Sequence, residues 1–494
     1  MFRNSLLESV KARLVLPELL ALPLHARIQR AIRQLILDGA LTAGTPLPAS
    51  RQLASSLGVS RDTIESAYSH LHAEGFIERR VGSGSFVAEA TRLSPGRRAP
   101  RRPRQASAGT ARLSLRGQAM LHHGGVREQL APRPFAPGVP ETRTFPLPTW
   151  ERLQRQVLKE FGARALMHGD PQGAEPLRRA IADYVNLERG ARTTAEQVLV
   201  LTSSQQALGL CASVLLDAGE RIFVEDPVYY GARKAFVAAG LDCQAIPVDE
   251  HGIEVDRLLA QPHSARAVYL TPSHQFPTGA TLSLERRLAL IEWAERAQAW
   301  IIEDDYDSEF HYAGKPTACV QGLDAHDRTL YIGTFTKSLF PGLRVGYLVL
   351  PPALVEPMTI ARSLQDGHTA SIAQLTLARF ISGGHFGAYV RHMRGLYAER
   401  LALLSELLER RLGGLVQPRV PAGGLQMPCL LSTALEEDVV IAAARSARIE
   451  LLGLSGLYVA RPPQPGFLMG FAAYTPDELE RAVDGLARCL EKRV

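Results

Sequence analysis

One run of the sequence, residues 330–347, constrains the chain more than any other. It reads LYIGTFTKSLFPGLRVGY, in which hydroxyl side chains surround Lys337 between two apolar stretches and a Pro-Gly turn precedes Arg344. A lysine amine can form a Schiff base with a carbonyl, and hydroxyls with a guanidinium bind phosphate. The run therefore indicates a ligand with both an aldehyde and a phosphate, which is pyridoxal 5′-phosphate (PLP). We expect Lys337 to anchor it and Thr334, Thr336 and Arg344 to contact its phosphate.

A solvated surface charge is the ordinary role of a lysine at a strand end, and it is the alternative interpretation of Lys337. The chain has six lysines among its 56 basic residues, so arginine is used almost everywhere that plain positive charge suffices. This bias favours amine chemistry at Lys337.

A second stretch, residues 299–310, supports the same ligand. It reads AWIIEDDYDSEF, an apolar strand that runs into acids. Ligands of open α/β sheets bind at the carboxyl ends of strands, which is where Asp304 and Tyr306 fall. PLP needs a carboxylate beside its pyridine nitrogen, and we expect Asp304 to supply it while Tyr306 donates to the ring's phenolic oxygen. A calcium loop, the alternative, lacks the required Gly and terminal Glu.

Together, EDDYDSEF and TFTKSLFPGLRVGY resemble the fold-type I aminotransferase domain of the MocR/GabR regulators, which are PLP-binding members of the GntR transcription-factor family. The resemblance covers nearly the whole chain. It implies an α/β fold with a smaller C-terminal α+β subdomain, and a homodimer for which head-to-tail pairing is one arrangement. The alternation of strands and helices after residue 132 independently predicts a mostly parallel sheet with helices on both faces. Strands are expected at 198–201, 221–224, 267–270, 299–303, 329–332 and 345–349.

The rest of the expected cofactor site lies after earlier strands. Ser203, Ser204 and Gln205 leave one strand and open a helix, so their amides and hydroxyls form an anion site at a positive helix end. In the family this stretch contacts the phosphate. By the same resemblance, Tyr229 matches the aromatic residue that stacks on the cofactor ring.

The sequence departs from the family pattern in three places. Phe276 replaces the Asn that bonds the ring oxygen in aminotransferases, which shifts that role to Tyr306. His168 replaces a Tyr that reaches the neighbouring subunit's phosphate. The late strand at 466–472 lacks the Arg that holds a substrate carboxylate in active aminotransferases. Arg461 and Arg233 are the candidates for holding an effector carboxylate, and surface arginine is the alternative interpretation of each.

Residues 24–87 predict a winged helix-turn-helix. Two short amphipathic helices are separated by Gly58-Val59-Ser60, with Ser50 and Ser60 as expected N-caps, and a glycine-rich basic hairpin follows at 76–87. A generic helical bundle explains the helices but not the basic hairpin. The region is similar to the GntR winged helix, and this resemblance implies DNA contacts by Arg51, Ser60, Arg61, Thr63, Arg80 and Gly82.

We predict three segments: a DNA-binding domain at 1–88, a linker at 89–131, and the PLP-binding, effector-sensing and dimerisation domain at 132–494. Residues 90–127 contain nine Arg and no acidic residue, which predicts an extended, mobile tether. The net charge of +6 permits contact with nucleic acid.

Composition argues against several other classes of protein. Five cysteines form no CxxC pair, so neither a disulfide framework nor a zinc site is expected, and no metal site is predicted. Charged residues and prolines interrupt the leucine-rich N-terminus before a signal peptide or membrane span could form. We expect a cytoplasmic protein.

The combined interpretation is a transcriptional regulator that binds operator DNA and senses an amino compound, or PLP itself, through an aldimine on Lys337. The aminotransferase-like domain is then a sensor rather than an enzyme, with residual or half transamination left open. One alternative is an active aminotransferase with an appended DNA-binding module. Another is a regulator that responds to PLP alone.

Overall fold

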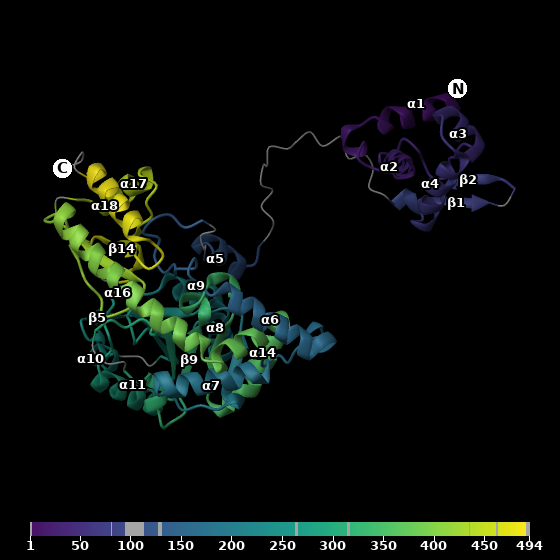
Figure 1. Ribbon diagram of the computed structural model, residues 1–494. Coiled ribbons are helices and arrows are strands. Elements are labelled where there is room, and N and C mark those ends of the chain that lie inside the picture. Colours follow the sequence, from purple (N-terminus) through teal and green to yellow (C-terminus); the bar gives the residue numbers. More distant parts are fainter. Residues whose placement is uncertain are drawn as a thin grey trace. The chain divides into compact units, whose positions relative to one another are not determined.

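The computed structural model describes residues 2–80, 82–93, 113–126, 131–261, 265–313, 317–433, 435–460 and 463–490. The chain divides into two compact units, Met1–Ala111 and Arg112–Val494. Each unit is described by itself (Figure 1). None of the described helices has the length and apolarity needed to cross a membrane.

Unit 1 is a helical domain followed by a hairpin. Its helices are α1 (Phe2–Leu14), η1 (Pro17–Leu19), α2 (Leu24–Leu37), α3 (Ser50–Leu57) and α4 (Arg61–Ala73), and its antiparallel strands are β1 (Ile77–Arg80) and β2 (Gly84–Val87). Apolar side chains at helical spacing, among them Ile28, Ile32 and Ile64, are buried in one core. The helices and hairpin have the order of a winged helix-turn-helix.

The turn between α3 and α4 is set by two local signals. Gly58 adopts a left-handed conformation with φ of 67°, which glycine accepts without steric cost, and so ends α3. Ser60 caps α4, because its Oγ accepts a hydrogen bond from the Thr63 amide at 3.1 Å, which confirms the predicted cap. The predicted cap at Ser50 is wrong by one position. Ala49 holds the cap position, and Ser50 is the first residue of α3.

The arginine-rich segment that spans the boundary of the two units contains helical structure. A 3-10 helix, η2, spans Glu89–Leu93, and α5 spans Leu115–His123. The serine at position 114 caps α5, since its Oγ accepts from the Gly117 amide at 3.1 Å. This differs from the predicted extended tether, because a local N-cap and contacts with helix α9 (Tyr230–Ala239) stabilise a short helix.

Unit 2 is built on an eight-stranded sheet in the order β3-β10-β9-β8-β7-β4-β5-β6. The strands are β3 (Val198–Leu201), β4 (Arg221–Asp226), β5 (Asp242–Asp249), β6 (Gly252–Ile253), β7 (Ala267–Leu270), β8 (Trp300–Asp305), β9 (Thr329–Thr334) and β10 (Gly346–Val349). Strands β5, β4, β7, β8 and β9 pair in parallel, whereas β10 is antiparallel to both of its neighbours. The carboxyl ends of β4, β7, β8 and β9 therefore meet at one edge of the sheet.

Helices cover both faces of this sheet, as the sequence predicted. Neighbouring residues of β8 show the two faces: Ile301 packs in the core cluster that contains Leu290 of α11, and Ile302 packs in the cluster that contains Leu208 of α8. Besides α5, the α-helices before β11 in unit 2 are α6 (Leu147–Phe161), α7 (Glu175–Arg189), α8 (Ser204–Leu215), α9, α10 (Val255–Leu259), α11 (Leu284–Ala297), α12 (Val320–Leu323), α13 (Phe335–Ser338), α14 (Val355–Asp366), α15 (Ser371–Ser382) and α16 (His385–Leu412).

The 28-residue helix α16 leads from the large sheet to a smaller C-terminal layer (Figure 1). This layer is a four-stranded antiparallel sheet in the order β11-β12-β14-β13, covered by α17 (Glu437–Ser446) and α18 (Pro476–Leu490). Its strands are β11 (Val416–Pro418), β12 (Gln426–Leu431), β13 (Leu452–Gly453) and β14 (Gly466–Gly470). The combination is the fold-type I aminotransferase architecture with its α+β subdomain.

Candidate functional site

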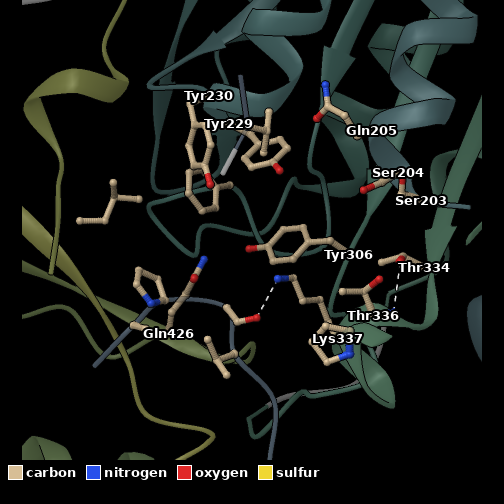
Figure 2. A pocket seen from close by; sticks show the side chains of 18 of the residues that line it. Ser203, Ser204, Gln205, Tyr229, Tyr230, Tyr306, Thr334, Thr336, Lys337 and Gln426 are labelled. Carbon is tan, nitrogen blue, oxygen red and sulfur yellow. Dashed lines mark hydrogen bonds between the residues drawn. The ribbon is translucent and has the colours of Figure 1, made fainter. Parts of the chain in front are cut away.

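A cavity of about 820 Å³ lies at the carboxyl ends of the parallel strands. Residues from the strand ends, from the N-terminus of α8, from β12 and from segments 124–126 and 136–142 line it. Figure 2 shows the polar and aromatic side chains that face it. All ten residues predicted to bind the cofactor are among the lining residues: Ser203, Ser204, Gln205, Tyr229, Asp304, Tyr306, Thr334, Thr336, Lys337 and Arg344.

Lys337 projects into this cavity from the short helix α13, directly after β9. Its Nζ donates a hydrogen bond to the carbonyl oxygen of Gly138 at 2.7 Å (Figure 2). Gly138 has φ of 67°, and a Cβ there would lie 3.0 Å from the lysine Nζ. Glycine at 138 therefore provides both the left-handed turn and the space in which the amine lies.

Asp304, the penultimate residue of β8, is buried at the floor of the cavity. Its Oδ2 accepts a hydrogen bond from the hydroxyl of Tyr269 at 2.9 Å, while its Oδ1 is buried and has no hydrogen-bond partner among the described residues. Burial raises the pKa of Asp304 to about 7, against the lowering effect of the Tyr269 hydrogen bond. A cation with an N–H group placed in the cavity would satisfy the free oxygen and stabilise the ionised carboxylate.

The acidic residues around Asp304 serve other purposes. Glu303 accepts hydrogen bonds from the amides of Val320 and Gln321 at the start of α12. Asp305 pairs with the guanidinium of Arg189 at 2.8 Å, and the hydroxyl of Tyr331 also donates to it. These contacts are structural, so one carboxylate at the end of β8 remains for a ligand.

Asp307 lies farther along the same segment. Its Oδ1 is 2.8 Å from Nδ1 of His274, so it also has a partner within the protein. None of the described residues forms a group of three or more His, Cys, Asp or Glu that could hold a metal ion.

One side of the cavity provides groups suited to an anion. Ser203 is the N-cap of α8, and its Oγ accepts a hydrogen bond from the Gln206 amide at 3.2 Å. Ser204 and Gln205 are the first residues of this helix and therefore lie at its positive end. The hydroxyls of Thr334 and Thr336 lie beside them in Figure 2.

Arg344, which also lines the cavity, is held at φ of 53°. Non-glycine residues seldom adopt this left-handed conformation, and such strained residues cluster at ligand sites.

Aromatic rings form another side of the cavity. Tyr229 packs edge-to-face against Phe276 with ring centroids 5.4 Å apart, and Phe276 packs against Tyr306 at 6.4 Å. Tyr306 and Lys337 point toward the same space in Figure 2. Phe276 thus lies between the two tyrosines with an apolar ring, and the nearby hydroxyl of Tyr306 is hydrogen-bonded to Gln426.

These observations fit pyridoxal 5′-phosphate. The cavity offers an amine for the aldehyde, a buried carboxylate with a free oxygen for the pyridine N–H, and hydroxyls with a helix N-terminus for the phosphate. The volume is within the range of small-molecule sites.

Of the two arginines predicted to hold an effector carboxylate, neither is placed at the cavity by the structure. Arg461 lies outside the described residues. Arg233 is on α9 but is not a lining residue, whereas its neighbour Lys234 is. His168, the family departure, is exposed and its Nδ1 lies 3.4 Å from Nε2 of His368.

Several lining residues were not identified from the sequence. Tyr269, Gly138, Gln426 and Lys234 all contribute to the cavity. The rarity of lysine in this chain was a usable signal for Lys234. The other three lie far from the two motifs along the chain, and only the fold brings them to the site.

In unit 1 the residues predicted to contact DNA lie at the surface of the winged helix. Arg51, Ser60, Arg61, Arg80 and Gly82 are exposed, and Thr63 is half-buried. The guanidinium of Arg80 lies 4.8 Å from the centroid of the Phe86 ring across the hairpin. Arg79, by contrast, donates to Glu65 on α4, which ties the hairpin to that helix.

Two family models match the chain. Residues 24–87 match "Bacterial regulatory proteins, gntR family", and residues 138–486 match "Aminotransferase class I and II". The two matches fall in the two compact units.

Curated relatives show the same combination over nearly their whole lengths. The chain is 36% identical over 470 residues to a probable rhizopine catabolism regulatory protein, MocR, of Rhizobium meliloti, covering 94% of this chain and 93% of that one. It is 31% identical over 455 residues to the pyridoxine biosynthesis transcriptional regulator PdxR of Corynebacterium glutamicum, covering 92% and 93%.

Among solved structures, unit 2 is similar to an aminotransferase. The α-aminoadipate aminotransferase LysN from Thermus thermophilus, solved with N-(5′-phosphopyridoxyl)-L-leucine, superposes with a TM-score of 0.68 at 26% identity. The match covers 72% of this chain and 92% of that one.

Asp304→Asn should stabilise the cofactor-free protein at high pH while weakening cofactor retention. The folded pKa of Asp304 lies above its unfolded value, so its contribution to stability is present at low pH and is lost as pH rises from about 4 to about 7. Asparagine keeps an acceptor for Tyr269 but cannot ionise. We expect the free energy of unfolding of the cofactor-free variant at pH 8 to exceed that of the wild type by roughly 2 kcal/mol.

Urea unfolding of both proteins at pH 4.5 and pH 8, before and after addition of PLP, measures this. A difference that is the same at both pH values would contradict the assignment of a raised pKa to Asp304.

Proposed function

This chain belongs to the MocR-type regulators, in which a gntR-type DNA-binding domain is joined to a class I and II aminotransferase domain, and from that premise we propose that it is a PLP-dependent transcriptional regulator. The winged helix binds operator DNA. The aminotransferase-like domain binds PLP and responds to a small molecule. Such a regulator acts in the cytoplasm, where its operator is.

We assign one function to each of the three segments proposed from the sequence. Residues 1–88 contact DNA through the first turn of α4 and the hairpin, residues 89–131 connect, and residues 132–494 hold the cofactor, sense the effector and dimerise. The exposed Arg61 at the start of α4 and Arg80 on the hairpin support this proposal. In winged-helix proteins, the N-terminus of the recognition helix and the hairpin are the parts that contact duplex DNA.

The observation that carries the proposal is the cavity. The amine of Lys337, a buried carboxylate with a free oxygen, and an anion site converge there from the ends of β9 and β8 and the start of α8. When bound, the cofactor supplies an aldehyde that reacts with primary amines. Lys337 supplies the protein's own amine, and its Nζ must leave the Gly138 carbonyl to do so.

A sensor is favoured over an enzyme by the residues around this cavity. Strand β14 reads GFLMG and carries no arginine for a substrate carboxylate. Phe276 stands where aminotransferases have an asparagine. An amino compound that binds at Lys337 would change which group the lysine contacts, and an effector shifts a two-state protein only through such differential contacts.

The first alternative, an active aminotransferase, makes a different prediction for turnover. The purified protein is incubated with a panel of amino acids and a keto-acid acceptor. We expect at most one turnover per subunit. Sustained multiple turnover would overturn the sensor proposal.

The second alternative is a response to PLP alone. It predicts that operator affinity differs between cofactor-free and PLP-bound protein and is unchanged by any amine. Operator binding measured with and without PLP, and then with amines, separates it from amine sensing.

A homodimer is part of the proposal. Leu166 and Met167 are 73% and 66% exposed, and Leu364 is 82% exposed. Leu166 and Met167 directly precede His168, Leu364 precedes His368, and the two histidine rings are in contact. Exposed apolar residues around one spot are typical of a surface that a second copy covers.

Lys337→Ala should abolish the visible absorption band of the PLP-loaded protein, because it removes the amine that we propose binds the aldehyde covalently. Lys159→Ala, which removes an exposed lysine of α6, is the matched control and should keep the band. Borohydride reduction followed by peptide mapping should place the label at Lys337. A label elsewhere would show that the anchor is misassigned.

Arg61→Ala should weaken operator binding by about tenfold and leave the PLP spectrum unchanged, since it removes one contact from the first turn of the recognition helix. Lys11→Ala changes net charge equally but lies on α1 and is the control. Fluorescence anisotropy at two salt concentrations measures both variants. Equal losses for the two would indicate a nonspecific charge effect.

A further inference from the structure

The basic residues of the cavity are few, and one of them has no role in holding PLP. Among the described lining residues, the basic side chains are Lys337, Arg344 and Lys234. The aldehyde engages Lys337 and the phosphate engages Arg344. Lys234 therefore remains as a cation beside the space that an effector would enter.

Lys234 is hydrogen-bonded to the segment that connects unit 2 to the DNA-binding unit. Its Nζ donates to the carbonyl oxygen of Gly125 at 3.0 Å and lies 5.7 Å from the centroid of the Tyr230 ring. Residues 124–126 follow α5 and line the cavity themselves. In Figure 2, Tyr230 and the hydroxyls of Ser203 and Ser204 stand on different sides of this cavity.

Helix α5 is held to unit 2 by surface contacts that bury none of its side chains. It packs on α9, and the Nε of Arg116 donates to the Ala238 carbonyl at 2.7 Å. None of its residues is buried, and Leu115 and Leu121 are 84% and 74% exposed. A segment with little buried apolar surface opens at low cost in free energy. The bond from Lys234 to Gly125 and the bond from Arg116 to Ala238 are both polar contacts that hold this segment.

We propose that Lys234 recognises the acid group of the effector, and that this recognition loosens the segment formed by α5 and residues 124–126. The inference rests on the proposed function and specifies its ligand: a small molecule with a primary amine for the PLP aldehyde and an anionic oxygen group for Lys234. The acid competes with the Gly125 carbonyl for the lysine ammonium.

Electrostatics gives the direction of this exchange. A carboxylate carries a full charge and a peptide carbonyl only a dipole, so the ammonium binds the carboxylate more strongly. An amine without an acid group offers no such competition. The segment formed by α5 and residues 124–126 is connected through residues 94–112 to the winged helix. Loosening it therefore lengthens the connection between the cavity and the DNA-binding unit.

Pairs of ligands that differ only in the acid group test the recognition step. Alanine is compared with ethylamine, and 5-aminopentanoate with butylamine, by titrating the visible band of the PLP-loaded protein. For the wild type we expect at least one of the two acids to bind about tenfold or more tightly than its amine. Lys234→Gln should remove that preference, and Lys234→Arg should keep most of it.

Arg233→Gln is the matched control, because Arg233 is the neighbouring cation on α9 but does not line the cavity. It should retain the preference for acids. If Lys234→Gln retains it too, the inference is wrong while the proposed function stands. If the wild type forms no visible band with PLP, the proposed function itself fails.

Hydrogen–deuterium exchange tests the loosening step. We expect the acid to speed exchange of the amides in residues 115–124 of the PLP-loaded wild type, and the paired amine to leave it unchanged. Lys234→Gln should exchange fast without any ligand. Slower exchange with the acid, or equal rates in all three samples, would overturn the proposed release of the segment.

Discussion

The cavity of unit 2 is built around a buried carboxylate that the described residues of the protein do not fully satisfy. Asp304 stands at the end of a central parallel strand with one oxygen bonded to Tyr269 and the other without a described partner. An uncompensated buried charge is costly, and burial raises the pKa of Asp304 to about 7 in response. The fold accepts this cost because the carboxyl ends of parallel strands meet, and a cationic ring nitrogen bound there removes it.

The acidic residues next to this carboxylate have different contacts from it. Consecutive residues of β8 alternate between the faces of the sheet, so Asp304 and Asp305 have different neighbours although they are adjacent in sequence. Asp305 is neutralised by Arg189 and Tyr331, which stabilises the strand end. Glu303 binds the first amides of α12. Glu303 and Asp305 thus have partners within the protein, whereas one oxygen of Asp304 has no partner among the described residues.

The end of the arginine-rich segment also lines the cavity. Helix α5 lies on α9, and the residues that follow it line the same cavity as Lys337. A ligand in that cavity is therefore next to the chain that leads to the DNA-binding unit. For the sensor that we propose, the change needed is local and lies in the polar contacts of this segment.

The sequence by itself predicted six of the eight strands of the large sheet and the helix-turn-helix with its Ser60 cap, because apolar runs, caps and strand-end polar clusters are local signals. The ten residues predicted around the cavity followed from strand-end positions together with the family resemblance. It did not determine the partner of Asp304, the glycine that accommodates Lys337, or the helix within the linker. Arg233 and Lys234 show the reason: they are adjacent on one helix, and about 100° of rotation separates successive residues. Which of them lines the cavity is decided by how α9 packs, and therefore only by the tertiary structure.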